Sequence, residues 1–358
     1  MVHLEKLLTV VIPAYNAQKF LGKCLDSLLR AGQYKEMELL VVDDGSADKT
    51  AEIAKSYEQH YKGIVRVLSK ENGGHGSAIN LGIREAKGKY FRVVDSDDTV
   101  NPLAYRAFLK ELKGIDSDLV ITPFARIHVG NGEKGVAGKR STIKRRKKKG
   151  KFTSVKIRDV EGTKRLPHGK NIAFEEAAKC MFVRMHECTI KTSILQEHNI
   201  TLSEHCFYVD MQFILYPVPW ILTCYILDLP VYRYQIGGKE QSVSIENMQK
   251  NRAQHSKVLA SLVRFYRERK RAGDSEARLS YLAGGIAKMQ AGQVQIALSL
   301  PVSGKAIKDL CRAEAWIMKR CPAGYYSNKK ISLWILRASR YHLYGVAALI
   351  FRIVKNKR

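Results

Sequence analysis

Three carboxylates in four positions, Asp95, Asp97 and Asp98, follow the apolar pair Val93-Val94 in the stretch RVVDSDDTV. Carboxylates this close repel one another and raise one another's pKa unless a cation or hydrogen-bond donors neutralise them. At an extended strand end, Asp95 and Asp97 point the same way, because the side-chain period of a strand is two. They would then clamp a hard cation such as Mg²⁺ or Mn²⁺, which binds through one or two carboxylates plus substrate phosphates. Asp98 points elsewhere and braces the turn.

Polar residues also follow other apolar runs of the chain. Tyr15 and Asn16 follow the first run, and Asp43 and Asp44 follow the second. The Gly-rich turn Gly73–Gly76 follows the third, where backbone N–H groups can approach a ligand. In an open α/β sheet, ligands bind beyond the carboxyl ends of the strands. The recurrence of polar residues at one edge predicts a ligand site there.

The elements that must position these residues alternate regularly between strand and helix over the first 125 residues. Four helices are predicted in this part of the chain. The first covers 20–29, and the second follows Ser46, which is expected to be its N-cap. The third contains Ile79 and Ile83, and the fourth begins with Pro102 at its first helical position. The stretch Pro13-Ala14-Tyr15-Asn16 is expected to break the first strand. The predicted strands are 8–12, 39–42, 64–68, 90–94 and 119–122. Such alternation predicts an α/β fold with a doubly wound, mostly parallel sheet flanked by helices.

The rest of the chain changes character. Residues 126–170 are expected to be a basic loop or insertion, with nine basic residues among the thirteen of Lys139–Lys151. That run is either a solvated charge run or an anionic surface contact. Residues 171–245 return to mixed structure, and residues 246–358 are predicted to be a helical, basic C-terminal region. The last helix, predicted over Tyr341–Lys357, either packs on the domain or lies in a membrane interface.

The charge balance restricts the partners. The 358-residue chain carries 61 Lys and Arg against 34 Asp and Glu, a net charge of +27, which predicts an anionic partner. The N-terminus does not have the pattern of a signal peptide, and no apolar run is long enough to span a bilayer. Seven cysteines without a CxxC pair indicate reduced, buried thiols in the cytoplasm.

Several kinds of site are absent from the sequence. There is no Walker motif, no complete dinucleotide fingerprint, no serine-hydrolase elbow and no zinc-type ligand spacing. A nucleotidyltransferase is an alternative, although such enzymes usually carry a basic, Gly-rich loop after the first strand, where this chain has Pro13–Asn16. A charge-driven binder of membrane or nucleic acid is the other alternative. The acidic strand ends would repel a polyanion, so binding of nucleic acid is not expected there.

The blocks VVIPAYN (10–16), LLVVDDGSADKT (39–50), KENGGHGSAINLGIREAKGKYFRVVDSDD (70–98) and FYVDMQF (207–213) resemble the inverting family 2 glycosyltransferases of GT-A fold. The first three blocks follow the order and spacing of that family. The resemblance implies a nucleotide-sugar-binding half over 1–125 and an acceptor-side half over 171–245. It implies a metal-dependent transfer of a sugar from a nucleotide-diphosphate sugar to an acceptor hydroxyl, with inversion.

The resemblance also implies roles for individual residues. Asp95 and Asp97 match the DxD motif that holds the ribose and the metal, and Asp210 matches the catalytic base. Val209 stands where the family usually has Glu, and Glu204 is the alternative base. The residues implied to border the nucleotide are Pro13, Tyr15, Asp43, Asp44, Lys70, Gly73, Gly74, Asn80, Arg84, Asp95 and Ser96. The residues implied on the acceptor side or in a diphosphate loop are His186, Lys191, Lys239, Gln241 and Ser242.

Cofactor, partners and place in the cell follow from the same resemblance. The cofactor is expected to be Mn²⁺ or Mg²⁺, and the donor a UDP-sugar. The acceptor is expected to be a glycan, a lipid-linked glycan or an anionic polymer in cell-surface polysaccharide or glycolipid synthesis. The protein is expected in the cytoplasm, with peripheral contact to anionic membrane through its basic surface.

Overall fold

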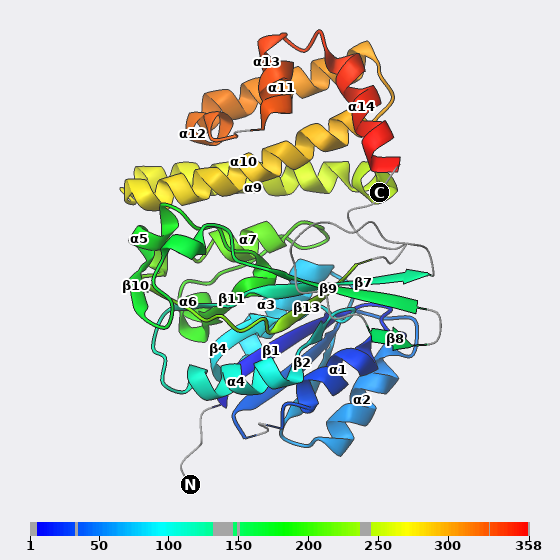
Figure 1. Cartoon of the computed structure of the whole chain (residues 1–358), viewed down its shortest axis with the longest axis vertical. Coiled ribbons are helices and arrows are strands. Elements are labelled where there is room, and N and C mark those ends of the chain that lie inside the picture. Colours follow the sequence, from blue (N-terminus) through cyan, green and yellow to red (C-terminus); the bar gives the residue numbers. More distant parts are fainter. Residues whose placement is uncertain are drawn as a thin grey trace. The chain divides into compact units, whose positions relative to one another are not determined.

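The computed structural model describes residues 6–32, 35–131, 146–148, 151–236, 245–328 and 330–356. The chain forms two compact units (Figure 1). The first unit comprises residues 1–205 and 220–238, and the second comprises 206–219 and 239–358. The sequence placed a boundary at 245/246. The structure instead groups the short segment 206–219 with the C-terminal residues, because its helix packs on helices of that region.

The first unit contains an eight-stranded, mostly parallel sheet. Across the sheet its strands are β10 (Asn171–Ala173), β12 (Thr223–Ile226), β6 (Leu119–Ile121), β11 (Cys188–Lys191), β4 (Gly88–Val93), β1 (Lys6–Ala14), β2 (Met37–Asp43) and β3 (Val65–Ser69). β11 runs antiparallel to both of its neighbours, and β10 is antiparallel to β12. The strand order reverses between β1 and β4, since β2 and β3 lie on one side of β1 and β4 on the other. Ligands bind at such a switch point.

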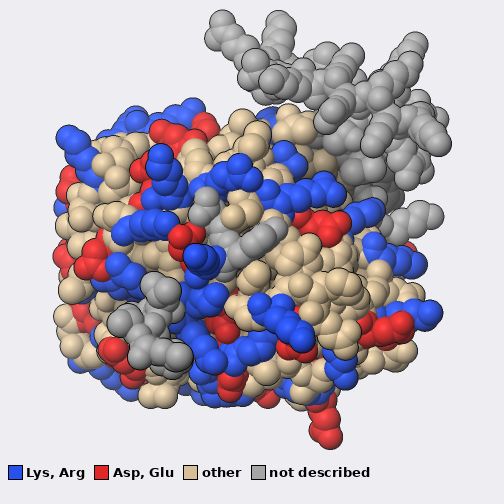
Figure 2. Space-filling view, turned by 90° about the horizontal axis from the view of Figure 1, so that it is seen from below, with Lys and Arg blue, Asp and Glu red and all other residues tan. Residues whose placement is uncertain are grey.

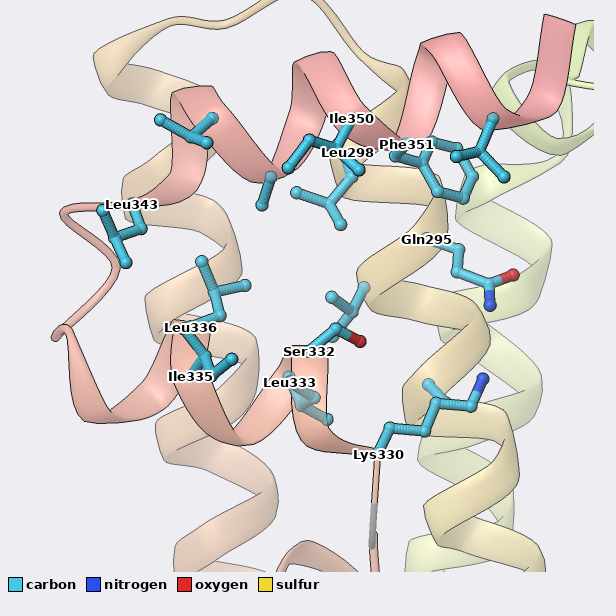
Figure 3. A pocket seen from close by; sticks show the side chains of 15 residues that line it. Gln295, Leu298, Lys330, Ser332, Leu333, Ile335, Leu336, Leu343, Ile350 and Phe351 are labelled. Atoms are coloured by element: carbon cyan, nitrogen blue, oxygen red, sulfur yellow. The ribbon is translucent and has the colours of Figure 1, made fainter. Parts of the chain in front are cut away.

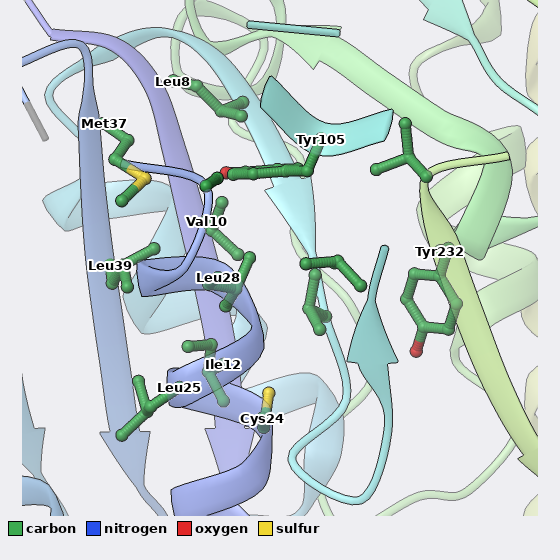
Figure 4. Packing of buried hydrophobic residues seen from close by; sticks show 14 of the residues in the cluster. Leu8, Val10, Ile12, Cys24, Leu25, Leu28, Met37, Leu39, Tyr105 and Tyr232 are labelled. Atoms are coloured by element: carbon green, nitrogen blue, oxygen red, sulfur yellow. The ribbon is translucent and has the colours of Figure 1, made fainter. Parts of the chain in front are cut away.

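Helices cover both faces of this sheet. They are α1 (Leu21–Leu29), α2 (Thr50–His60), α3 (His75–Glu85), α4 (Pro102–Leu112), α5 (Phe174–Ala178) and α6 (Thr192–Glu197), with 3₁₀ turns η1 (Thr163–Arg165) and η2 (Met185–Glu187). The turn η3 (Val218–Trp220) lies where the chain returns from the second unit to the first. Leu21, Leu25 and Leu28 recur at helical spacing and face the sheet. They join a core with Leu8, Val10 and Ile12 of β1, together with residues of β2 and α4 (Figure 4).

α3 packs on the opposite face of β1. Val11, whose side chain points away from Val10 and Ile12, meets Gly82 of α3. A Cβ built on Gly82 would lie 2.6 Å from both methyl carbons of Val11. The glycine therefore lets α3 approach the sheet closely, and this brings the first turn of α3 to the carboxyl edge.

A second, five-stranded sheet corrects the expectation of a loop over 126–170. Its strands, in order, are β5 (Thr99–Val100), β13 (Tyr232–Ile236), β7 (Phe124–Asn131), β9 (Lys151–Arg158) and β8 (Arg146–Lys148). The alternation in KFTSVKIR is a strand pattern that the high basic content obscured. Of the basic run Lys139–Lys151, residues 139–145 and 149–150 lie outside the described residues.

Two local predictions were wrong. β1 continues through Pro13 to Ala14, because its ladder with β4 ends at Val11 and the missing N–H of Pro13 faces that side. Ser46 does not cap α2. Its hydroxyl accepts the N–H of Asn16 at 3.0 Å, while the carboxylate of Asp48 accepts the N–H of Thr50, the first residue of the helix, at 3.0 Å.

The second unit is helical, as the sequence predicted for the C-terminal region. Its helices are α7 (Asp210–Leu215), α8 (Ile245–Lys250), α9 (Arg252–Arg271), α10 (Glu276–Ser299), α11 (Gly304–Arg320), α12 (Pro322–Tyr326), α13 (Ile331–Ala338) and α14 (Tyr344–Asn356). A small core joins α10, α11, α13 and α14. Among the described residues, no helix has the length and apolarity needed to cross a membrane.

Charged and thiol side chains complete the description of the surface and core. Lys and Arg are spread widely over the face shown in Figure 2, with Asp and Glu between them. All seven cysteines are free. Five are buried as predicted, whereas Cys180 is exposed and Cys311 is partly exposed, which corrects the expectation for these two.

Candidate active site

The acidic residues after β4 form a tight turn. The N–H of Asp98 donates to the carbonyl of Asp95 at 3.0 Å, so residues 95–98 are not the extended strand end expected from the sequence. Asp98 braces the turn as predicted. It is buried, and its carboxylate accepts the Tyr232 hydroxyl at 2.5 Å and the Gln235 N–H at 2.7 Å. Burial, together with the charges of Asp95 and Asp97, raises the pKa of Asp98 to about 9.

Asp95 is held by two side chains. One carboxylate oxygen lies 3.0 Å from Nε2 of His75, the first residue of α3, and the other accepts the Tyr232 hydroxyl at 3.3 Å. Burial acts to raise the pKa of Asp95, but the hydrogen bond and charge of His75 hold it below its usual value. Asp95 is therefore the member of the group whose ionised form the surroundings favour.

Asp97 differs from its neighbours because its side chain is exposed. Desolvation and the charge of Asp95 raise the pKa of Asp97, so the free turn disfavours a second charge there. A divalent cation would relieve this repulsion, and two carboxylates offer the hard oxygen ligands that Mg²⁺ and Mn²⁺ prefer. No group of three or more metal-binding side chains occurs among the described residues. The donor set thus fits a cation that is shared with phosphate oxygens.

The Gly-rich turn is organised by Asp44. One oxygen of this buried carboxylate accepts Nζ of Lys70 and the N–H of Gly73, both at 2.9 Å. The other oxygen accepts the N–H of Gly74 at 2.7 Å. A Cβ on Gly73 would collide with Ser77, and Gly74 has a φ of 83°, so both positions need glycine. The hydrogen bonds indicate that Asp44 positions this turn; contact with a base stays a prediction.

The remaining nucleotide-side residues lie at the same edge. Pro13 is buried near the end of β1, and Tyr15 beyond it is 55% exposed, so its ring is free to cover a ligand. Asp43 is buried at the end of β2, and its carboxylate accepts the N–H of Ser46 at 3.2 Å. Ser96 occupies the second position of the Asp95–Asp98 turn and is partly exposed.

Of the other predicted residues, Asn80 holds a neighbouring segment, and Arg84 and Lys191 lie away from this position. The buried amide of Asn80 exchanges two hydrogen bonds with the backbone of Leu202, so it holds that segment to α3. Arg84 is exposed near the C-terminal end of α3, roughly 13 Å along the axis from His75. Lys191 pairs with Tyr90 at the start of β4, because β11 runs antiparallel, and is thus roughly 16 Å along the strand from Asp95. The sequence could not show that direction.

His186 reaches the site from η2. Its ring stacks on those of Tyr232 and Tyr234, with centroids 4.9 and 5.0 Å away, and meets Phe124 edge-on at 5.5 Å. Burial lowers the pKa of His186 to about 4, the charge of Asp95 opposes the shift, and Arg92 adds to it. His186 is therefore a neutral, aromatic neighbour of the acidic turn at physiological pH.

The two candidate bases lie in different units. Asp210 is exposed at the first position of α7 in the second unit. Glu204 is exposed in the first unit, where its carboxylate accepts the Asn80 amide at 3.3 Å. The next residue, His205, donates its N–H to the carbonyl of Gly73 at 2.5 Å. The structure therefore brings Glu204 to the Gly-rich turn. Lys239, Gln241 and Ser242 lie outside the described residues.

The sequence reasoning missed three residues of this site, namely His75, Tyr232 and Gln235. His75 lies within the Gly-rich turn Gly73–Gly76, and that position was the available signal. Tyr232 and Gln235 come from β13, more than 130 residues beyond Asp95 in the chain. Only the pairing of β13 with β5 brings them to the turn.

Comparisons with known proteins agree with this geometry. The profile of the family described as "Glycosyl transferase family 2" matches residues 9–174. Glycosyltransferase GlyG of Streptococcus pneumoniae is 39% identical over 119 residues, 33% of this chain and 39% of GlyG. The uncharacterized glycosyltransferase EpsJ of Bacillus subtilis is 36% identical over 114 residues, 32% of this chain and 33% of EpsJ. The alignments thus span less than half the length of these curated relatives.

A solved structure resembles nearly the whole chain. S. aureus TarS 1-349, in complex with UDP, is similar with a TM-score of 0.57 and 18% sequence identity, over 96% of this chain and 88% of that one. This likeness concerns the fold, and it agrees with the GT-A-type, mostly parallel sheet and helical C-terminal region predicted from the sequence. The Asp95–Asp98 turn, the Gly-rich turn and the switch point between β1 and β4 all lie within segment 9–174, the part of the chain that is similar to glycosyl transferase family 2.

Proposed function

We propose that the protein transfers a sugar, with inversion, from a nucleotide-diphosphate sugar to an acceptor hydroxyl. The observation that carries this proposal is the acidic turn Asp95–Asp98 at the switch point of a family 2 fold. Tyr232 holds this turn by a hydrogen bond to Asp98, and Asp97 is exposed. We take the donor to be a UDP-sugar, the nucleotide of the TarS complex being UDP. The acceptor is proposed to be a glycan, a lipid-linked glycan or an anionic polymer of the cell surface.

Different residues of the site would have different roles in the reaction. Asp95 and Asp97 would hold a divalent cation, Mn²⁺ or Mg²⁺, which supplies positive charge to the leaving diphosphate when it is bound. Tyr232 and Gln235 keep the turn closed by binding Asp98. Tyr15 would cover the base, and the Gly73–Gly74 turn would border the nucleotide. Inversion needs a carboxylate on the opposite face that accepts the proton of the acceptor hydroxyl.

The decisive experiment separates donor binding from proton transfer. Asp97→Asn should abolish Mn²⁺-dependent binding of UDP in calorimetry, while Asp116→Asn, a control at an exposed aspartate, should leave it unchanged. Asp210→Asn should bind UDP normally but lower kcat on a responsive UDP-sugar by about 10²- to 10⁴-fold. Glu204→Gln is measured beside it. Near-normal turnover of Asp210→Asn together with loss in Glu204→Gln would move the base to Glu204, and unchanged UDP binding by Asp97→Asn would refute the metal site.

We also propose that the protein works in the cytoplasm and contacts an anionic membrane surface through α13 and α14. The buried sides of these helices pack inward through Leu333, Leu336, Tyr344 and Ala348. On their outer sides large apolar residues are exposed, among them Trp334 at 67%, Leu349 at 60% and Ile353 at 49%.

The charge of this region suits anionic lipid. Residues 315–358 contain ten Lys and Arg and no Asp or Glu. An apolar pocket of about 380 Å³ opens between α10, α13 and α14, with Ile335, Leu343 and Ile350 on its walls (Figure 3). Exposed apolar side chains beside a local excess of basic residues are what an interfacial helix presents to anionic lipid. A lipid-linked acceptor would be met at such a surface.

A further inference from the structure

One face of the five-stranded sheet carries aromatic and arginine side chains in register. Phe124 of β7 pairs with Arg158 of β9 on one side and with Tyr232 of β13 on the other. One step further along, Arg126 of β7 pairs with Tyr234 of β13. Paired residues point to the same face of a sheet, and so do residues two apart on one strand. All five side chains therefore belong to a single face.

A third arginine joins this face from outside the sheet. Arg184, immediately before η2, places its guanidinium carbon 5.9 Å from the centre of the Phe124 ring. The guanidinium carbon of Arg126 lies 5.8 Å from the same centre. We call Arg126, Arg158 and Arg184 the arginine cluster. Burial lowers the pKa of Arg126, and the charges of Arg158 and Arg184 lower it further, as expected for cations that share a small, half-buried space.

The arginine cluster has too few counter-charges. Arg184 binds Glu187 at 3.1 Å and approaches Glu161 at 3.7 Å. Among the residues that the structure describes, neither Arg126 nor Arg158 has a carboxylate within ion-pair distance. The Nε atoms of both are buried and lack a hydrogen-bond partner in the same part of the chain. A buried donor without an acceptor is costly, and an anion bound at the arginine cluster would supply the acceptor.

The cluster is continuous with the acidic turn. Tyr232 reaches Asp98 and Asp95 with its hydroxyl, and its ring stacks on His186. His186 stacks in turn on Tyr234, beside Arg126 in the sheet register. A layer of aromatic rings thus links the proposed cation site to the arginine cluster. A molecule that lies on this layer would have one end near each.

We propose that the arginine cluster binds a phosphate or carboxylate group of the acceptor. This rests on the proposed function, because it places the donor diphosphate at Asp95 and Asp97. Guanidinium groups match phosphate and carboxylate with paired hydrogen bonds, and aromatic side chains supply rigid contact area for the carbon skeleton of a sugar or polyol. The preferred acceptor is therefore an anionic one, such as a polyol phosphate or a glycan with acidic substituents.

The test uses full-length protein with inorganic phosphate and glycerol 1-phosphate as probes, and with glycerol as the uncharged probe. Binding is followed by phosphorus NMR and, for glycerol, by proton NMR. UDP with Mn²⁺ is titrated in parallel by calorimetry. The variant Arg126→Gln/Arg158→Gln removes two charges of the cluster. Its matched control, Lys55→Gln/Lys62→Gln, removes two exposed charges at α2 and in the turn that follows it. Arg126→Lys/Arg158→Lys keeps the positive charges but loses the planar guanidinium groups that donate paired hydrogen bonds. Thermal melts verify that each variant is folded.

We expect both phosphate probes to bind more tightly than glycerol. Arg126→Gln/Arg158→Gln should weaken them at least tenfold, the lysine variant should recover part of the loss, and the α2 control should match wild type. Binding of Mn²⁺ with UDP should be unchanged in all of them. Equal weakening of UDP would assign the arginines to the donor and overturn the proposal. The proposal would also be overturned if wild-type protein did not bind phosphate, or if the α2 control bound phosphate as weakly as Arg126→Gln/Arg158→Gln.

The two proposals fail separately. If UDP with Mn²⁺ binds in an Asp97-dependent way but phosphate does not bind at the arginines, the acceptor inference alone is overturned. If phosphate binds in an arginine-dependent way but no nucleotide binds, the anion site is supported and the proposed donor is overturned.

Discussion

At the scale of single residues, the crowding of three carboxylates after β4 is resolved by giving each a different environment. Asp95 is held by His75 and Tyr232, Asp98 is buried and bound by Tyr232 and Gln235, and Asp97 alone is exposed. Asp97 is the exposed member of the group, and the charge of Asp95 contributes to raising its pKa. That difference makes the turn a candidate cation site rather than a solvated turn.

Tyr232→Phe tests this division. The variant removes the hydroxyl that binds Asp98 at 2.5 Å and contacts Asp95 at 3.3 Å, which leaves buried carboxylate oxygens without a donor. We expect the free energy of unfolding to fall by about 1–3 kcal/mol and the Kd for Mn²⁺ with UDP to rise. Urea denaturation and calorimetry measure the two effects. Tyr234→Phe, on the same strand, is the control, and an equal loss there would contradict the role of Tyr232.

Glu187 gives the site a pH dependence. Its side chain is fully buried, and burial raises its pKa from 4.5 to about 7, although Arg184 opposes the shift. Between these values the folded chain holds a proton that the unfolded chain has released. The stabilising contribution is therefore complete below about pH 4.5 and is lost as the pH rises through about 7.

Glu187→Gln should flatten this part of the stability profile. Relative to wild type, the variant should gain on the order of 1–3 kcal/mol in unfolding free energy between pH 5 and pH 7.5. Urea denaturation at the two pH values provides the comparison. Glu52→Gln, at an exposed carboxylate of α2, should keep the wild-type slope. A parallel slope for Glu187→Gln would show that Glu187 is ionised throughout.

At the scale of elements, α3 connects packing with the site. Its first residue, His75, binds Asp95, and its glycine Gly82 lies against Val11 of β1. The N-terminal end of α3 lies beside the acidic turn that follows β4. A shift of α3 away from the sheet would therefore move His75 relative to this turn.

Gly82→Ala should therefore impair both stability and the site. The added methyl would lie 2.6 Å from carbons of Val11, and α3 must move to make room. We expect a loss of about 1–3 kcal/mol in unfolding free energy and weaker binding of Mn²⁺ with UDP. Gly284→Ala in α10 is the matched control, since nothing lies within 4 Å of its new methyl. It should be neutral or slightly stabilising because alanine favours helix. Equal effects of both changes would refute the packing argument.

At the scale of the whole molecule, the net charge of +27 and the exposed apolar side chains are the features that concern a partner. In the second unit, α13 is fixed by a buried network. The carboxylate of Glu314 in α11 accepts hydrogen bonds from the guanidinium of Arg337 at 2.7 Å, the hydroxyl of Tyr341 at 3.1 Å and the side-chain amide of Gln290 at 2.6 Å. The exposed apolar residues of α13 are thus displayed on an ordered scaffold.

Vesicle flotation tests the membrane proposal. Full-length protein should float with vesicles that contain phosphatidylglycerol, less with pure phosphatidylcholine, and less again at high salt. Trp334→Ser/Leu349→Ser/Ile353→Ser should reduce the floated fraction at least severalfold. The control Leu103→Ser/Leu222→Ser/Val302→Ser changes three exposed apolar residues outside α13 and α14. Equal flotation of the two triple variants would contradict a role for these helices.

The sequence by itself determined the regular elements of the first unit. Apolar runs of period two or 3.6 and their Gly, Pro and Asp boundaries are local signals, so β1 to β4, the intervening helices and the acidic turn were predicted within a few residues. The same locality explains the errors at Pro13 and Ser46. In each case a hydrogen-bond partner from another segment decided the outcome.

Only the tertiary structure decided which distant residues meet. The antiparallel direction of β11 places His186 beside the acidic turn and Lys191 at the far end of the sheet. The pairing of β13 with β5 and β7 supplies Tyr232, Gln235 and the face that bears the arginine cluster. Strand direction and pairing between segments depend on long-range packing, which leaves no periodic trace in the sequence of either segment.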